Sequence, residues 1–299
     1  MIYERTIRKP ADCSGVGLHS GAPVHLRILP AAPGTGIVFR RTDLDGFEVE
    51  AISRNVARVS YATSLMKKGV LISTTEHLLS AFIGMGVDNA VVELDNLEVP
   101  ILDGSAMPFI EMLTNAGLRQ QRRKRVYLKI LRPCELQEGD KFIGVYPAER
   151  YSVSYAIDFP HPLIGSERFQ VELSNGSYVT DIASARTFGF IEQQQAMLNM
   201  GLIRGASRDN CVVLTRDGID NPPLRYQDEF VRHKVLDLIG DLALFGKRIL
   251  GYVKADRAGH ALHTAIVSRI MRDQSYAEEI TLDEAAIADW PLEHLAVAD

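Results

Sequence analysis

The stretch Asp228-Glu-Phe-Val-Arg-His-Lys-Val-Leu-Asp-Leu-Ile-Gly-Asp-Leu242 decides how the rest of this chain can fold. It predicts a helix on which His233, Asp237 and Asp241 recur every four residues, slightly more than one turn, and therefore share one face. Most other positions are apolar, so we expect the helix to be largely buried. Burying two carboxylates and an imidazole is costly unless they pair with one another or bind a metal.

A second polar pair stands far upstream, where Glu76 and His77 begin an apolar helix expected to end at Gly84. His77 could join His233 and Asp237 as a third metal ligand, with Glu76 beside the water that completes the site. Three protein ligands and one water form the open tetrahedral arrangement of hydrolytic zinc sites. Spacing alone leaves the question open, because a single His-x-x-x-Asp on a helix is more often a surface or capping pair.

The composition is that of a folded, soluble protein. The chain has 299 residues, enough for one large domain or two of ordinary size, with 46% hydrophobic and 24% charged residues. A net charge of −5 argues against general nucleic-acid binding. The N-terminus lacks the apolar core of a signal peptide, and no apolar run approaches the ~18 residues of a membrane span. Three scattered cysteines indicate free thiols, so we expect a cytoplasmic protein without stable membrane insertion.

The basic stretch 118–125 is expected to be a solvated connector between two domains, 1–125 and 126–299. An RNA-binding patch is the alternative, but the stretch has no interleaved aromatic residues on which bases could stack. Strands are predicted in both halves, at 24–28, 36–39, 47–51 and 70–73, and at 126–130, 142–146, 152–158 and 169–173.

Each half then ends in a similar way. The first half has a helix from 75, a strand at 90–94, a glycine loop and a helix from 108. The second half has the His233 helix, a strand at 250–254, a glycine loop and a helix at 260–271. This parallel suggests duplication of one α+β unit. Residues 186–214, with a predicted helix at 192–199 and a strand at 211–214, have no counterpart in the first half and could serve only for packing.

Six short motifs run along the chain: Ser14-Gly-Val-Gly-Leu-His-Ser-Gly21, Ser73-Thr-Thr-Glu-His-Leu78, Glu98-Val-Pro-Ile-Leu-Asp-Gly-Ser-Ala106, Ala185-Arg-Thr-Phe-Gly-Phe190, Val231-Arg-His-Lys234 through Asp241-Leu242, and Gly259-His-Ala-Leu262. Together they resemble the UDP-3-O-acyl-N-acetylglucosamine deacetylases of lipid A synthesis, the LpxC family. They follow the family's order, at similar intervals, over nearly the whole chain. One motif would be weak evidence, whereas six in register are specific.

The resemblance implies an α+β fold of two similar β-α-α-β domains, packed as a sandwich with the helices between two sheets and a small insert in each domain. The helices of His77 and His233 become equivalent, so a metal between them would lie at the domain interface. The insert 186–214 becomes a βαβ element that forms a hydrophobic passage for a fatty acyl chain. The implied reaction is removal of acetate from UDP-3-O-(3-hydroxyacyl)-N-acetylglucosamine, the committed step of lipid A biosynthesis in a Gram-negative-type cell.

The resemblance also assigns roles to single residues. The family's metal ligands, for Zn²⁺ or alternatively Fe²⁺, match His77, His233 and Asp237. Residues that act in the reaction match Glu76 as general base, His260 as general acid, Asp241 as the carboxylate that keeps His260 charged, and Thr187 as a hydrogen-bond donor to the tetrahedral intermediate. Substrate contacts match Phe188, whose ring would stack on the substrate, and Lys234, whose ammonium would meet the phosphate region.

Plainer roles exist for several of these residues. Glu76 could merely favour the helix dipole at a helix N-terminus, Phe188 could be a core aromatic, and Lys234 could be a solvated cation. His19 lies in a family motif without ligand spacing and is expected to be structural or peripheral. His263 follows His260 by three residues, lies on the same helix face and could influence its titration.

Two other functions compete with this one. A catalytically inactive nucleotide-sugar or lipid-binding protein could use the same fold, but here every expected catalytic position is filled. A zinc peptidase would require His-Glu-x-x-His, which the chain lacks. The expected partner is therefore a small-molecule nucleotide-sugar lipid substrate, with no nucleic acid, and the chain is expected to be a monomer.

Overall fold

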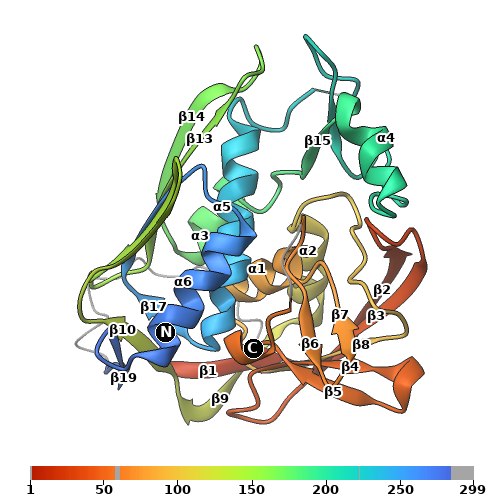
Figure 1. Ribbon diagram of the computed structural model, residues 1–299. Coiled ribbons are helices and arrows are strands. Elements are labelled where there is room, and N and C mark those ends of the chain that lie inside the picture. Colours follow the sequence, from red (N-terminus) through yellow and green to blue (C-terminus); the bar gives the residue numbers. More distant parts are fainter. Residues whose placement is uncertain (1, 58–60, 222, 284–299) are drawn as a thin grey trace.

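Two five-stranded sheets face each other across a layer of helices in the computed structural model, which describes residues 2–57, 61–221 and 223–283 (Figure 1). The first sheet has the order β2(Ala11–Val16), β3(Pro23–Pro30), β8(Ala90–Leu94), β4(Ile37–Arg41), β5(Phe47–Glu50). The second has the order β11(Cys134–Glu138), β12(Lys141–Tyr146), β18(Tyr252–Asp256), β13(Ser152–Phe159), β14(Gly165–Glu172).

The two sheets have the same topology. In each, the central strand is antiparallel to one neighbour and parallel to the other, as β8 is to β3 and β4 and β18 is to β12 and β13. This confirms the α+β fold of two similar units. The division into two domains at residue 125 stays a prediction. The end of the predicted second domain, residues 284–299, lies outside the described residues.

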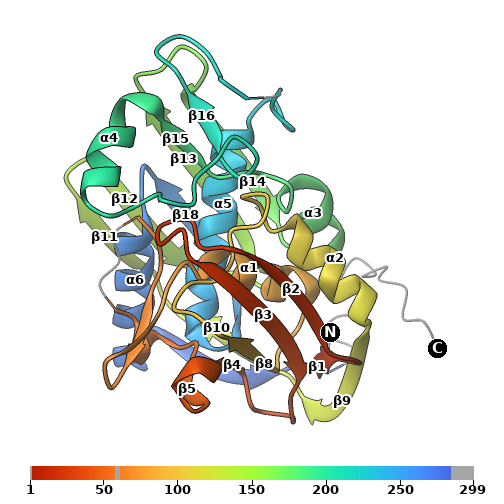
Figure 2. The same cartoon turned by 90° about the vertical axis from the view of Figure 1, so that its right-hand side faces the viewer.

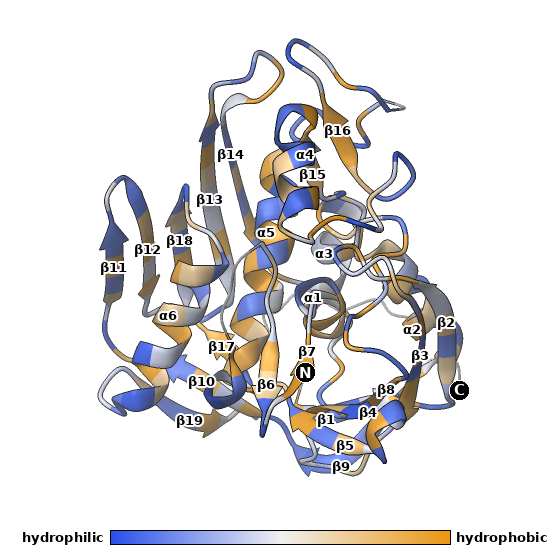
Figure 3. Cartoon of the chain, turned by 45° about the vertical axis from the view of Figure 1, so that its right-hand side comes forward, coloured by the Kyte–Doolittle hydropathy of each residue, from blue (hydrophilic) through white to orange (hydrophobic). Residues whose placement is uncertain are grey.

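The strands form because polar and apolar residues alternate along them, as the colouring in Figure 3 shows. In β3, for example, Val24, Leu26 and Ile28 are buried while the residues between them are exposed. Successive side chains of a strand point to opposite faces, so one face packs on the helices and the other meets solvent. The single strand expected at 250–254 is instead two, β17(Arg248–Leu250) and β18, separated at Gly251.

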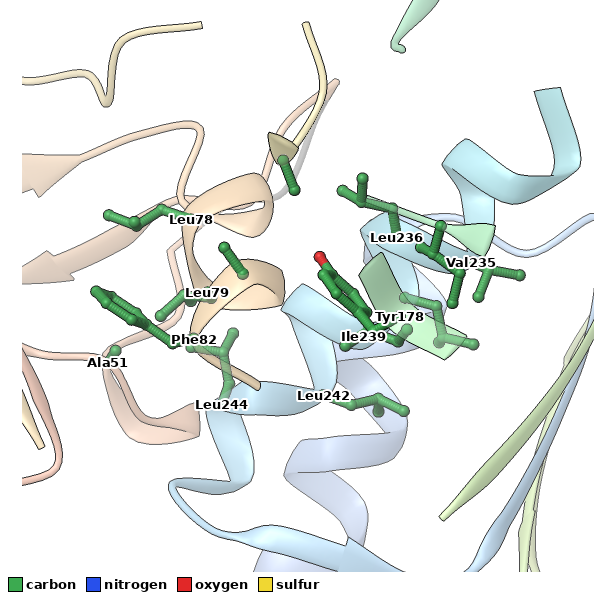
Figure 4. Close-up of a cluster of buried hydrophobic side chains, with 14 of the residues drawn as sticks. Ala51, Leu78, Leu79, Phe82, Tyr178, Val235, Leu236, Ile239, Leu242 and Leu244 are labelled. Carbon is green, nitrogen blue, oxygen red and sulfur yellow. The ribbon is translucent and has the colours of Figure 1, made fainter. Parts of the chain in front are cut away.

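The central layer consists of α1(Glu76–Met85), α2(Met107–Ala116), α3(Asn175–Asp181), α5(Glu229–Leu242) and α6(His260–Arg272). Apolar side chains of α1 and α5 meet in the core, among them Leu79 and Phe82 on α1 and Leu236 and Ile239 on α5 (Figure 4). Gly84 was expected to end α1, but the helix continues to Met85, and Gly84 instead leaves room for the ring of Tyr178.

A close approach between α1 and α5 sets the geometry of the site. A Cβ added at Gly240 of α5 would collide with the backbone carbonyl of Glu76 on α1. Only glycine therefore lets the two helices cross here, next to Glu76 and His77 on one side and Asp237 and Asp241 on the other.

The basic stretch 118–125 is not a connector, contrary to the prediction. It is strand β9(Leu118–Lys124), antiparallel to β1(Tyr3–Ile7). Its charges were misleading because most of them point outward, whereas Gln121 and Arg125 point inward. The Arg125 guanidinium is 1% exposed and forms a bidentate pair with Asp88, with Nε 2.7 Å from Oδ1 and Nη2 2.6 Å from Oδ2.

Smaller elements complete the described chain. β10(Val126–Ile130) lies between β17 and β19(Ala277–Thr281), and β6(Leu65–Lys67) pairs with β7(Val70–Ile72). The predicted βαβ insert is β15(Phe188–Phe190), α4(Ile191–Asn199) and β16(Val212–Leu214), with its strands parallel, and it lies beyond the N-terminal half of α5 (Figure 2). Among the described residues, no helix is both long enough and apolar enough to cross a membrane.

Candidate active site

The three metal ligands predicted from the sequence, His77, His233 and Asp237, meet where α1 and α5 cross. The Asp237 Oδ1 atom lies 3.3 Å from Nε2 of His233 and 3.6 Å from Nε2 of His77. All three side chains are buried, and their ligand atoms lie within 4.8 Å of one another. Two imidazole nitrogens and a carboxylate oxygen are a donor set of catalytic zinc sites, so these residues fit a divalent metal.

Contacts of His233 prepare its ring for ligation. Its Nδ1 lies 3.1 Å from the carbonyl oxygen of Ala185, which as an acceptor requires a hydrogen on Nδ1. The lone pair of Nε2 is thereby turned toward Asp237 and His77, as in metal sites where the far nitrogen is held by a backbone carbonyl. Burial, partly opposed by the charge of Asp237, lowers the pKa of His233 to about 4, so the ring is neutral at neutral pH.

A second group of side chains, suited to proton transfer, lies beside the first. His260 Nε2 is 3.8 Å from Glu76 Oε1, and His260 Nδ1 is 2.7 Å from Asp241 Oδ2. The Thr63 hydroxyl donates to the other oxygen of Asp241, and the Thr63 backbone N–H donates to Glu76 Oε2 at 3.1 Å. The helices α1, α5 and α6 thus bring one carboxylate and one imidazole face to face, with a second carboxylate behind the imidazole.

The charges in this group follow from burial and pairing. Burial by itself would lower the pKa of His260, but Asp241 and then Glu76 raise it to about 9. Burial raises the pKa of Glu76 to about 7, against the opposing effect of His260 and His77. At neutral pH, therefore, His260 is an imidazolium able to give a proton. The pKa of Glu76 lies near neutral pH, which suits a general base.

The remaining predicted residues line a cavity of about 530 Å³ that opens onto both groups. Thr187 borders it, with its backbone N–H donating to Gly104 and its carbonyl accepting from Val212. The Phe188 ring packs 5.0 Å from that of Phe230. The Lys234 ammonium lies 2.9 Å from Asp237 Oδ2 and 5.5 Å from the Phe188 centroid, so it is paired rather than freely solvated.

The insert forms the apolar part of this cavity. Side chains of α4 and its flanking strands, including Phe190, Ile191, Met197 and Val213, face it together with Phe159. No residue of α4 is buried, and Ile191 and Leu198 remain 41% and 38% exposed. A larger cavity of about 990 Å³ touches the other side of α6, but none of the predicted site residues lines it.

His19 and Tyr61 lie at the cavity, and Glu98 holds the loop that carries His19, although the sequence alone did not place these three residues there. His19 was expected to be structural or peripheral, yet it lines the cavity with Tyr61. Buried Glu98 accepts hydrogen bonds from the backbone N–H groups of His19 and Ser20, at 2.9 and 2.8 Å, and so holds this loop. The available signal was that both His19 and Glu98 stand inside the matched motifs.

Known proteins resemble this chain over nearly its full length. The model of the family LpxC, UDP-3-O-acyl N-acetylglycosamine deacetylase, matches residues 4–272. The UDP-3-O-acyl-N-acetylglucosamine deacetylase of Solibacter usitatus (strain Ellin6076) is 55% identical over 287 residues, which are 96% of this chain and 97% of that protein. The protein of the same name from Myxococcus xanthus (strain DK1622) is 44% identical over 277 residues, 92% of this chain and 88% of that protein. The chain belongs to the LpxC family.

Proposed function

We propose that this chain removes acetate from the 2-acetamido group of UDP-3-O-(3-hydroxyacyl)-N-acetylglucosamine, leaving UDP-3-O-acyl-glucosamine, in lipid A biosynthesis. The observation that carries the proposal is one buried arrangement. Two imidazole nitrogens and a carboxylate oxygen converge within 4.8 Å, next to the facing pair Glu76 and His260. Such an arrangement suits metal-assisted hydrolysis of an amide.

His77, His233 and Asp237 would hold the metal, with Zn²⁺ the proposed ion and Fe²⁺ the alternative. Imidazole and carboxylate ligands accept both ions, so the donor set narrows the choice without singling out one. When bound, the metal would acidify a water molecule and polarise the amide carbonyl.

The protein's own groups then move the protons. Glu76 takes a proton from a water molecule while the oxygen of that water forms a bond to the amide carbon. Thr187 donates a hydrogen bond to the oxygen on which negative charge develops. His260, held by Asp241, gives its proton to the nitrogen as the C–N bond breaks, so that acetate and an amine leave. Asp241 is needed because a helix N-terminus and burial would otherwise disfavour the charged ring.

Substrate contacts are proposed from the same cavity. Phe188 offers an aromatic face at its wall, and Lys234 offers a cation for the diphosphate, which would compete with Asp237 for the ammonium. The apolar surface of α4 would receive the 3-O-acyl chain. A catalytically inactive binding protein is less well supported, since such a protein would have no use for Glu76 and His260 facing each other beside a ligand set.

We also propose that the protein acts in the cytoplasm as a monomer. Free Cys13, Cys134 and Cys211 are typical of a reducing compartment.

The test of the function itself is acetate release from the acylated nucleotide sugar by purified protein whose metal content has been measured. Failure to release acetate with a full complement of metal would contradict it.

The acyl chain is expected to contribute strongly to catalysis. Each methylene buried against the insert is worth about 0.8 kcal/mol, so several of them should raise kcat/KM by orders of magnitude over plain UDP-N-acetylglucosamine. The comparison of kcat/KM for the two substrates measures this directly. Equal values would show that the passage beside α4 is not used.

The Asp241→Asn variant is expected to shift the alkaline limb of the kcat/KM profile to lower pH. The reaction needs protonated His260, so activity is lost as pH rises through the His260 pKa, about 9 in the unmodified chain. Asp241 is the main group that raises this pKa, and an amide cannot replace its charge. An alkaline limb that stays in place would mean that another group supplies the proton.

A further inference from the structure

One oxygen of Asp241 contacts two histidines. Its Oδ2 lies 2.7 Å from Nδ1 of His260 and 2.8 Å from Nδ1 of His263. The two histidines are three residues apart on α6 and so share one face of the helix. Asp241 and His263 are both fully buried, at 0% exposed. The mechanism proposed above uses His260 and Asp241 but has no role for His263.

Hydrogen positions in this cluster follow from its contacts. Burial alone would raise the pKa of Asp241, but His260 and the hydrogen bonds from both histidines lower it, so the side chain is a carboxylate. A carboxylate oxygen only accepts, so both Nδ1 atoms carry hydrogen. On its far side, His263 Nε2 lies 3.2 Å from the Tyr155 hydroxyl, which is also 2.6 Å from the carbonyl oxygen of Ala258.

Only one of the two rings is charged at neutral pH. Two imidazolium ions on one carboxylate oxygen would repel each other. Burial lowers the pKa of His263, while Asp241 and Glu76 raise that of His260 despite burial. His263 is therefore a neutral donor beside a charged one. The titratable groups that face the pair are Asp237 and Asp241 from α5, Glu76 from α1, Tyr155 from β13 and His19 from the loop after β2.

We propose that His263 is a positioning residue, whose neutral ring donates to the Asp241 oxygen that also holds His260, fixing that carboxylate and weakening its hold on the His260 proton. A hydrogen bond to a carboxylate stabilises its charge and leaves less of that charge to act on a second partner. His260 then gives up its proton to the leaving amine more readily. This consequence rests on the proposed function, in which His260 is the acid.

The test compares His263→Leu, which has no donor, with His263→Asn, whose amide can donate from nearly the position of the imidazole Nδ1. The titration of His260 is followed by NMR of ¹⁵N-histidine-labelled, zinc-loaded protein, together with the alkaline limb of kcat/KM for acetate release. His263→Leu is expected to move both upward by about half to one pH unit, because Asp241 Oδ2 then accepts a hydrogen bond from His260 alone. His263→Asn is expected to restore both toward the original position.

Tyr155→Phe is the matched control, since it removes a buried hydroxyl next to His263 and leaves the Nδ1–Asp241 hydrogen bond in place. It should leave the His260 titration unchanged even if the melting temperature falls. His263→Ala replaces His263→Leu in the comparison if the latter does not fold. Unchanged titration in the donor-free variant, or equal shifts in the Leu and Asn variants, would overturn the role of the hydrogen bond. Expected NMR shifts in a protein that releases no acetate would instead contradict the proposed function and support this inference.

Discussion

Alanine at His77, His233 or Asp237 is expected to remove stoichiometric metal and to lower kcat/KM by about a thousandfold or more, the equivalent of several kcal/mol of transition-state stabilisation. Each side chain would supply one of the three proposed ligand atoms, and these lie within 4.8 Å of one another. Two remaining ligands would hold a divalent ion far less tightly. Metal content of the dialysed protein and acetate release are the measurements.

His25→Ala is the matched control for the metal experiment. His25 is an exposed histidine on β3, 3.5 Å from Asp12, and does not line the cavity. Its loss should change neither metal content nor activity. Circular dichroism of each ligand variant would show that the fold is kept. If all three ligand variants still carried one tightly bound metal, the assignment of these residues would be wrong.

Glu76→Ala is expected to lower kcat by about a hundred- to ten-thousandfold while leaving the metal bound. Glu76 is buried and lies opposite His260, and its Oε2 is held by the backbone of Thr63, so its carboxylate is positioned but is not one of the three ligands. The substitution removes the group that we propose to accept the water proton. The measurements are single-turnover acetate release and metal content on the same sample.

Two further variants serve as the control and the comparison for Glu76→Ala. Glu48→Ala removes an exposed carboxylate on β5 that pairs with Arg40 on β4 of the first sheet, and it should change neither activity nor metal content. His260→Ala should flatten the alkaline limb of the pH profile, because loss of the His260 proton is the main contribution proposed for that limb. The limbs are macroscopic, so ionisation of a water acidified by the proposed metal would contribute to them as well. A Glu76→Ala variant with nearly full activity would require another base, and His19, which lines the same cavity, would be a candidate.

Local sequence patterns were sufficient for the elements that carry the chemistry. The strand at 90–94 was predicted with its observed bounds, and α5 and α6 lie where the apolar periodicity of the sequence places them. The spacing of His233, Asp237 and Asp241 specified one shared helix face, because helical geometry depends only on nearby residues. The six motifs also identified the family, because each of them is a short stretch of sequence that can be recognised without knowing the fold.

Contacts between distant residues could not be read in this way. The charges of 118–125 suggested a solvated connector, and only pairing with β1 and the burial of Arg125 against Asp88 made it a strand. Similarly, nothing in the sequence around His19 shows that Glu98 holds its loop, or that Asp241 binds His260 and His263 through one oxygen. Such contacts depend on which strands pair and how closely helices cross, as at Gly240, and these are properties of the whole packed chain rather than of any segment of it.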